Sequence, residues 1–241
     1  MVVRLAMWSG PRNVSTALMR SFGARVDTLV VDEPLYASYL AASGTDHPGR
    51  EAVLASQPTD WRVVARALTG PLPAGVGVHY QKHMAHHLLP ETGRDWLAGL
   101  SHAYLIREPA RVVASYARVR GTPTLADLGY RQQVELFRRY GGPVVDAADL
   151  LGDPAGVLAA LCAAVGIGYD PAMLAWAPGP RDTDGVWAPW WYAGVEASTG
   201  FVAPDAHPAV VPDRLAPLVD EALPYYAELA AHRIGADDLT G

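Results

Sequence analysis

Short apolar segments alternate with helical segments along most of this chain, and this alternation is the feature that most restricts its fold. The apolar segments have the length and character of buried strands at 2–8, 27–31, 75–81, 102–106 and 143–147. Between them, the sequence predicts helices at 13–22, 109–120, 124–140 and 154–166, and several short helices within 35–75. Buried strands separated by helices indicate a parallel sheet covered by helices on both faces. We therefore predict an α/β fold in a single domain over residues 1–241.

Composition supports a folded domain and restricts its partners. Half of the 241 residues are hydrophobic and 18% are charged, which provides a large core and excludes global disorder. The net charge of −6 argues against nucleic acid or an anionic membrane as the main partner. Residues 1–8 are too short for a signal sequence, and no stretch approaches the roughly 18 to 20 apolar residues of a membrane span. The only cysteine, Cys162, is expected to be a buried, unreactive thiol. These features predict a cytoplasmic protein and leave its oligomeric state undetermined.

The segment SGPRNVST (9–16) follows the first predicted strand and opens the first predicted helix. A strand, a glycine-containing turn and a helix N-terminus together present backbone N–H groups and a positive helix end to an anion. Arg12 adds a full charge, Ser15 and Thr16 add hydroxyl groups, and Asn13 or Ser15 is predicted to cap the helix. The Gly-Lys pair of nucleotide triphosphatases is absent from this loop. Taken alone, the segment also fits an ordinary capped helix.

The segment LIREPARVVASY (105–116) repeats this layout of strand, charged tip and helix. Arg107 follows the strand 102–106 at the carboxyl edge of the sheet, where open α/β sheets bind ligands. Ser115 comes eight residues later, two turns into the next helix. Two such sites in one chain predict a ligand with two separated phosphate groups.

Together the two segments resemble the phosphosulfate-binding segments of the sulfotransferases that use 3′-phosphoadenosine 5′-phosphosulfate (PAPS). QKHMAHHLLP (81–90) is similar to the family segment that carries the catalytic histidine, and VDEP (31–34) resembles the acidic motif of bacterial and carbohydrate-type members. These motifs occur in the family's order between residues 8 and 116. On this basis the chain is identified as a bacterial member of the family, with a P-loop-like phosphosulfate-binding loop after its first strand.

The resemblance implies a set of donor-binding residues. For the 5′-phosphosulfate they are Arg12, Asn13, Ser15 and Thr16, and for the 3′-phosphate they are Arg107 and Ser115. Arg181, in RDTDGVW (181–187), is the best candidate for the C-terminal segment that holds the 3′-phosphate in the family. The resemblance also implies PAPS as the donor and a small-molecule acceptor with a hydroxyl or amine.

Sulfuryl transfer resembles phosphoryl transfer, an in-line displacement helped by cations on the leaving group. We expect these cations to be Arg12 and Lys82, which is the only lysine among 19 basic residues and therefore marks a place where a compact ammonium is needed. The acceptor must lose its proton to a base. His83, which the resemblance places in register with the family's base, titrates near neutral pH without perturbation, and Glu33 would do so if burial raised its pKa.

Because Lys82 and His83 are adjacent in the sequence, the backbone conformation decides whether their side chains can reach the same site. Adjacent residues of a strand point to opposite faces, so both side chains reach one site only if the chain turns there. We predict such a turn, with both side chains within reach of the transferred group. Four histidines lie close together in this part of the sequence: His79, His83, His86 and His87. They do not form an HExxH pattern and have no neighbouring cysteine, so we predict no metal site.

Residues 177–212 are rich in Trp, Gly and Pro and are expected to fold irregularly over the site. Their aromatic residues are predicted to pack this segment or to line the acceptor pocket; they are Trp187, Trp190, Trp191 and Tyr192. Two other function classes stay open. The run VVDEP also fits a P-loop kinase-like nucleotide enzyme, and Val14, where the family commonly has glycine, fits a degenerate, non-catalytic nucleotide-binding protein.

Overall fold

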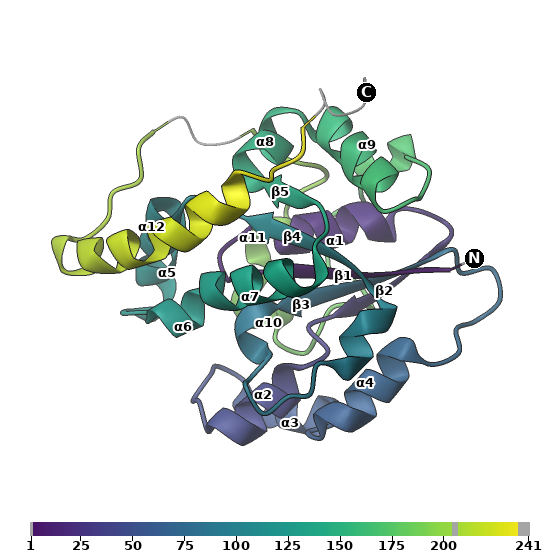
Figure 1. Ribbon diagram of the computed structural model, residues 1–241, viewed down its shortest axis with the longest axis horizontal. Coiled ribbons are helices and arrows are strands. Elements are labelled where there is room, and N and C mark those ends of the chain that lie inside the picture. The colour runs from purple at the N-terminus through teal and green to yellow at the C-terminus, as the bar shows by residue number, and fades with distance from the viewer. Residues whose placement is uncertain (1, 204–206, 236–241) are drawn as a thin grey trace.

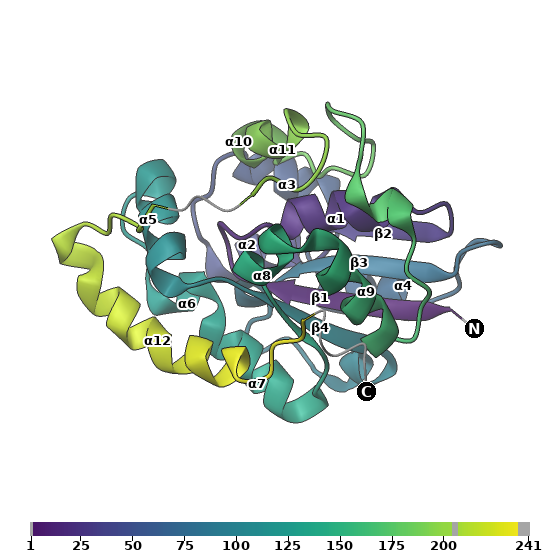
Figure 2. The same ribbon diagram turned by 90° about the horizontal axis from the view of Figure 1, so that it is seen from above.

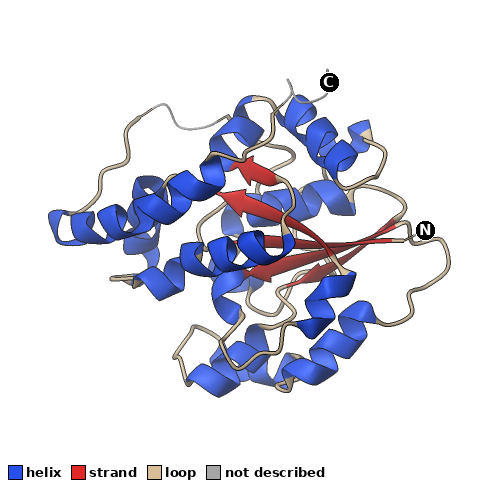
Figure 3. Cartoon of the chain, in the orientation of Figure 1, coloured by secondary structure: helices blue, strands red, loops and turns tan. Residues whose placement is uncertain are grey.

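The computed structural model describes residues 2–203 and 207–235, and a parallel sheet forms its centre (Figures 1 and 3). In spatial order the five strands of this described sheet are β2 (Thr28–Asp32), β3 (Val78–Met84), β1 (Val3–Ser9), β4 (Ser101–Ile106) and β5 (Val144–Asp146). Each neighbouring pair is parallel. The α/β fold with a parallel sheet, predicted from the alternation of apolar and helical segments, is confirmed.

Helices between the strands and after the last strand cover both faces of the sheet. They are α1 (Ser15–Gly23), α2 (Tyr36–Ser43), α3 (Arg50–Ser56), α4 (Trp61–Thr69), α5 (Pro109–Arg120), α6 (Leu125–Leu128), α7 (Tyr130–Tyr140), α8 (Ala147–Gly152), α9 (Pro154–Ala164), α10 (Ala188–Trp191), α11 (Ala193–Glu196) and α12 (Ala216–Ala230). Single turns of 3₁₀ helix occur at η1 (Ala85–His87), η2 (Asp95–Gly99), η3 (Pro171–Leu174) and η4 (Asp213–Leu215). Figure 2 shows α7 and α12 on one side of the sheet and α1, α10 and α11 on the other.

The central strand β1 distributes its side chains between two cores. Leu5 and Met7 pack into the core on the α1 side, and Ala6 and Trp8 pack into the core on the α7 side. This alternation follows from the period of two along a strand. Because both faces are covered, the run Leu5–Trp8 in the middle of the strand is apolar on both faces instead of alternating between apolar and polar residues.

Two local predictions were wrong. The helix predicted over 124–140 is two helices, α6 and α7, separated by Gly129 with a φ of 75°. This break brings the carbonyl oxygen of Leu128 against Gly10, where an added Cβ would lie 2.3 Å from that oxygen. The first helix begins at Ser15 after Val14 and has no side-chain cap, so neither Asn13 nor Ser15 caps it.

Cys162 is fully buried, and burial raises the pKa of its thiol to about 11. A thiol that stays protonated at neutral pH is a poor nucleophile, as expected from its apolar surroundings. Among the residues that the structure describes, none of the helices combines the length and apolar character needed to cross a bilayer.

The face of β3 that points away from α1 carries a buried polar row. His83 stacks on the indole of Trp8 with 4.4 Å between ring centroids, and its Nε2 lies 3.2 Å from Oε1 of Gln81. The Trp8 indole N–H donates to Nδ1 of His102 at 3.0 Å. Burial, together with smaller effects of nearby His102 and His79, lowers the pKa of His83 to about 3. The pKa values of His79 and His102 are also lowered, mainly by burial.

We predict that this row makes the fold acid-sensitive. As pH falls through about 6.5, the unfolded chain binds protons on histidines that the folded chain keeps neutral, so stability is full above that pH and lost below it. His83 alone should contribute a loss of about 2 kcal/mol between pH 7 and pH 5. Urea unfolding at these two pH values measures it, and His83→Phe should remove that part of the loss. An equal loss in the variant would contradict the assignment.

Candidate active site

The loop between β1 and α1 is held against the end of β4 by Asn13. The Asn13 Nδ2 donates to the carbonyl oxygen of Leu105 at 2.9 Å, and its Oδ1 accepts from the N–H of Val14 at 2.9 Å. Arg12 has a left-handed φ of 56°, which costs a non-glycine residue about 1 to 2 kcal/mol. The surrounding contacts therefore maintain a loop conformation that the chain would not adopt alone.

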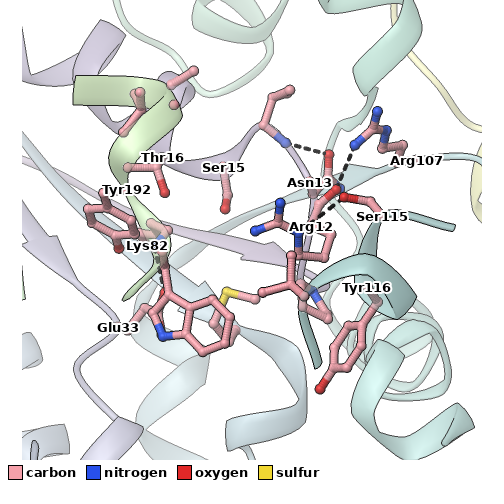
Figure 4. Close-up of a pocket in the computed structure, with 18 of the residues that line it drawn as sticks. Arg12, Asn13, Ser15, Thr16, Glu33, Lys82, Arg107, Ser115, Tyr116 and Tyr192 are labelled. Atoms are coloured by element: carbon pink, nitrogen blue, oxygen red, sulfur yellow. Dashed lines mark hydrogen bonds and ion pairs between the residues drawn. The ribbon is translucent and has the colours of Figure 1, made fainter. Parts of the chain in front are cut away.

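The two segments predicted to bind anions contact each other (Figure 4). The Arg107 Nη1 donates to the carbonyl oxygen of Arg12 at 2.7 Å, and the Arg12 Nε donates to Oγ of Ser115 at 3.1 Å. The Tyr130 hydroxyl donates to the carbonyl oxygen of Arg107. Burial lowers the pKa of both arginines, and neighbouring arginines lower it further. Positive charge is thus concentrated in a partly buried place, where an anion would be stabilised.

A cavity of about 430 Å³ opens at this carboxyl edge of the sheet. It is lined by the two arginines and by Ser15 and Thr16 at the start of α1. All predicted site residues except His83 and Arg181 line it; they are Arg12, Asn13, Ser15, Thr16, Glu33, Lys82, Arg107 and Ser115. The topology accounts for this gathering, because β1, β2, β3 and β4 all end at the same edge.

Lys82 is buried beside this cavity with three oxygen partners. Its ammonium donates to Oδ1 of Asp32 at 2.8 Å, to Oε1 of Glu33 at 2.6 Å and to the Tyr192 hydroxyl at 2.7 Å. Asp32 and Lys82 are register partners on β2 and β3, so their side chains lie on the same face. Although burial favours the neutral amine, the two carboxylates raise the pKa of Lys82 well above its usual value. The ammonium therefore stays charged, with all three N–H groups engaged.

Glu33 follows β2 in a constrained turn. Its φ is 39°, its N–H donates to the carbonyl oxygen of Lys82 at 2.9 Å, and its own carbonyl accepts from Nε2 of Gln57 at 3.2 Å. Burial raises the pKa of its carboxyl group, the ammonium of Lys82 opposes this, and the charge of Asp32 adds to it. A carboxyl group with a raised pKa in a cavity is a candidate proton acceptor near neutral pH.

His83 does not line the cavity, and the prediction that it shares a site with Lys82 was wrong. The chain does not turn after Lys82, because β3 continues as a regular strand through Met84. Lys82 points to the α1 side, whereas His83 packs on Trp8 on the other side of the sheet. The next side chain of β3 on the cavity side is that of Met84, which does line the cavity.

Arg181 is exposed and also lies outside the cavity lining, contrary to the role predicted for it. Its guanidinium donates to the carbonyl oxygen of Ala177 at 2.9 Å. The nearby contacts to the site come instead from Asp184, which forms a buried 2.6 Å ion pair with Arg20, and from the N–H of Gly185, which donates to Asp32 at 3.1 Å. These bonds attach the segment before α10 to β2 and α1.

The aromatic residues of the C-terminal segment divide between the two predicted roles. Trp187 is buried and donates to the Tyr192 hydroxyl at 3.1 Å, whereas Trp190 is half exposed over Gly49. Trp191 and Tyr192 line the cavity. Trp187 and Trp190 thus pack the C-terminal segment, and Trp191 and Tyr192 contribute to the wall of the cavity.

Sequence reasoning missed several residues that line the cavity, namely Tyr36, His47, His86, His87 and Tyr116. The sequence signal for His86 and His87 is their place directly after β3, in the segment QKHMAHHLLP that resembles the family's catalytic-histidine segment. Within residues 2–203 and 207–235, no group of three His, Cys, Asp or Glu side chains is arranged to hold a metal ion.

Comparison with known proteins places this geometry in context. The model of the family described as "Sulfotransferase domain" matches residues 3–233. Three solved structures have the same fold. A sulfotransferase from Alicyclobacillus acidocaldarius has a TM-score of 0.59 at 14% identity and covers 97% of both chains. The sulfotransferase domain of the curacin biosynthetic pathway has a TM-score of 0.55 at 15% identity and covers 95% of this chain and 98% of that one. The sulfotransferase domain of a Synechococcus olefin synthase has a TM-score of 0.54 at 17% identity and covers 90% and 93%.

Two Arabidopsis thaliana proteins are more similar in sequence. Branched-chain-amino-acid aminotransferase-like proteins 1 and 2 are 38% and 34% identical to this chain over 231 residues. The match covers 93% of this chain and 41% of each relative. The chain thus spans about two fifths of the length of these relatives.

We predict that removing the ammonium of Lys82 destabilises the fold. Lys82→Met leaves Asp32 and Glu33 buried without a cation, which should lower the free energy of unfolding by about 3 to 5 kcal/mol. Urea denaturation measures the change. The matched control is the triple variant Lys82→Met, Asp32→Asn, Glu33→Gln, which removes all three charges and should recover much of the loss. Wild-type stability in the single variant would show that the ion pairs do not support the fold.

Proposed function

Because this chain belongs to the sulfotransferase domain family, we propose that it transfers a sulfuryl group from PAPS to a hydroxyl or amine of a small molecule. The observation that carries the proposal is the contact of the two anion-binding segments at one cavity, through Arg107 with Arg12 and Arg12 with Ser115. A ligand with a phosphosulfate at one end and a second phosphate on the same nucleoside requires two such sites close together.

The donor-binding residues divide by position. Ser15 and Thr16 stand in the first turn of α1, where backbone N–H groups and the helix dipole favour the 5′-phosphosulfate. Arg107 and Ser115 suit the 3′-phosphate, and Arg12, which contacts both of them, suits a position between the two groups. Asn13 maintains the loop, because both ends of its amide already bond to the backbone.

The donor supplies an activated sulfuryl group, and the chain's own residues position it and move one proton. The acceptor oxygen or nitrogen forms a bond to sulfur, and the bond from sulfur to the 5′-phosphate oxygen breaks with its electron pair left on that oxygen. Arg12 is placed to stabilise the charge that develops there. We assign the acceptor's proton to Glu33, which lines the cavity, in preference to His83 on the other face. Lys82 acts by holding Glu33, since its three N–H groups are engaged.

The geometry gives less support to the kinase-like alternative. A P-loop kinase would need the carboxylates after β2 for Mg²⁺, but Asp32 and Glu33 both contact the ammonium of Lys82. A non-catalytic binding protein shares the donor contacts and differs from an enzyme only in turnover.

The donor site predicts an order of nucleotide affinities. Adenosine 3′,5′-bisphosphate should bind more tightly than AMP, ADP or ATP with magnesium, because only it places phosphates at both sites. Arg107→Ala should weaken the bisphosphate about ten- to a hundredfold, the value of a charge-assisted contact. It should change the affinity for adenosine 5′-phosphosulfate far less, since that ligand lacks the 3′-phosphate. Isothermal calorimetry measures all of these affinities. Tighter binding of magnesium ATP would favour the kinase-like reading, and equal losses in the variant would make Arg107 a structural residue.

The proton acceptor can be identified with a pair of variants. Glu33→Gln should lower PAPS turnover about a hundredfold or more, whereas His83→Phe should stay within about threefold of the wild type. Release of adenosine 3′,5′-bisphosphate is followed with a panel of phenols, alcohols and amines. Bisphosphate affinity and melting temperature are checked in each variant. The reverse result would return the role to His83, and absence of turnover in the wild type with every acceptor would support the binding-protein alternative.

A further inference from the structure

The cavity offers few positive charges to the second phosphate of the proposed donor. Among the described residues that line it, the arginines are Arg12 and Arg107. Arg107 already donates one N–H to the carbonyl oxygen of Arg12, and Arg181 lies outside the lining. A phosphate monoester carries about 1.5 to 2 negative charges at neutral pH. A further cation beside Ser115 would therefore stabilise this phosphate.

The cavity reaches the surface of the molecule along the second half of α5. Ser115 lines the cavity and is buried, with 7% of its surface exposed. Val119, one turn further along the helix, also lines the cavity and is 49% exposed, and Val202 lines it with 71% exposed. Lining residues that are this exposed mark the rim of the cavity. The helix α5 thus runs from the wall of the cavity at Ser115 to its rim at Val119.

Arg118 stands at this rim. It precedes Val119 and follows Ser115 by three residues, and residues three apart on a helix are neighbours on its surface. Its side chain is exposed and lies outside the lining of the cavity. No hydrogen bond or ion pair to another described residue holds its guanidinium. A long side chain without such a partner is free to turn toward an anion at the rim.

The charge of Arg118 acts on both arginines that line the cavity. Burial is the main cause that lowers the pKa of Arg12, and the charge of Arg118 adds to it. Burial and then Arg111 lower the pKa of Arg107, with smaller contributions from Arg12 and Arg118, while Tyr130 opposes them. Positive charges that stand close together favour an anion that can contact all of them.

We propose that Arg118 contacts the 3′-phosphate from the rim of the cavity and is a specificity-determining residue for the donor. The proposal rests on the proposed function and adds a residue that lies outside the motif LIREPARVVASY (105–116). Arg111, on the same helix, suits this role less well, because its Nε lies 3.3 Å from Oε2 of Glu108. In the proposed site, Arg107 and Ser115 hold the phosphate on the inner side and Arg118 covers it on the solvent side.

The variant Arg118→Gln tests this role by calorimetry with two nucleotides. At about 20 mM salt it should weaken adenosine 3′,5′-bisphosphate about fivefold, the upper range for an exposed ion pair. The affinity for AMP should change by less than about twofold, because AMP lacks the 3′-phosphate. At about 500 mM salt the loss for the bisphosphate should fall below about twofold, since salt screens an exposed charge.

Two further variants serve as controls. Arg118→Lys keeps the charge and should retain most of the affinity, because a rim cation acts mainly as a point charge. Arg66→Gln makes the same charge change at another exposed arginine, on α4. The buried side of α4 packs through Val64 and Leu68 into the core on the α7 side of the sheet. This control should therefore leave both affinities unchanged, and the melting temperature of each variant reports on its fold.

Three results would overturn the proposal: unchanged bisphosphate affinity in Arg118→Gln, an equal loss for AMP, or an equal loss in Arg66→Gln. They are distinguishable from failure of the proposed function. If the wild type did not bind adenosine 3′,5′-bisphosphate, the proposed function and the role of Arg118 would both be rejected. If the wild type bound it and Arg118→Gln bound it equally well, only the role of Arg118 would be rejected.

Discussion

The buried ammonium of Lys82 joins segments that are far apart in the sequence, and the shape of the site depends on it. Through Asp32 and Glu33 it ties β3 to the end of β2, and through Tyr192 it ties both strands to the C-terminal segment. Asp32 extends the connection, since it also accepts from the Tyr192 hydroxyl and the N–H of Gly185. Three charges in a buried place are stable only as a complete set, because any one left alone would carry its full desolvation penalty. The cavity wall and the candidate proton acceptor therefore share one electrostatic support.

The part of the cavity around Arg12 and Arg107 is assembled differently, by backbone constraint and not by ion pairing. Gly10 lets the carbonyl of Leu128 approach the loop after β1, and Asn13 ties that loop to β4. These backbone contacts hold Arg12 and Arg107 close together although their positive charges repel each other. Burial strengthens this repulsion. Such an arrangement favours an anionic ligand beside the two arginines, whereas the charge of Lys82 is matched by two carboxylates. The arginine charge that lines the cavity is therefore concentrated at the loop after β1 and at the end of β4.

The sequence was informative where a local pattern determines the structure. It was less informative where the structure is determined by packing between segments that are distant in the sequence. The strand and helix pattern predicted the parallel sheet. The strand ends predicted a shared site, and most of the predicted site residues do line the cavity, because the carboxyl ends of parallel strands share one edge. The break at Gly129 was missed because helical periodicity continues through it, while the reason for it is the approach of Leu128 to Gly10. His83 was misplaced because motif register outweighed the period of two, which already put it on the face opposite Lys82. Arg181 was chosen by resemblance alone, and the contacts to the site come from its neighbours Asp184 and Gly185.

The same geometry explains why the chain has one lysine at this position among eighteen arginines elsewhere. Three oxygens surround the Lys82 nitrogen at 2.6 to 2.8 Å, which matches the three N–H groups of an ammonium. A guanidinium would bring five N–H donors in a plane, and in a fully buried place the surplus donors would lack partners. A compact charge is therefore needed, as the sequence indicated, but the need arises from the assembly of β2, β3 and the C-terminal segment. In the proposed reaction the ammonium fixes where Glu33 stands, and the positive charge that would face the donor comes from the arginines.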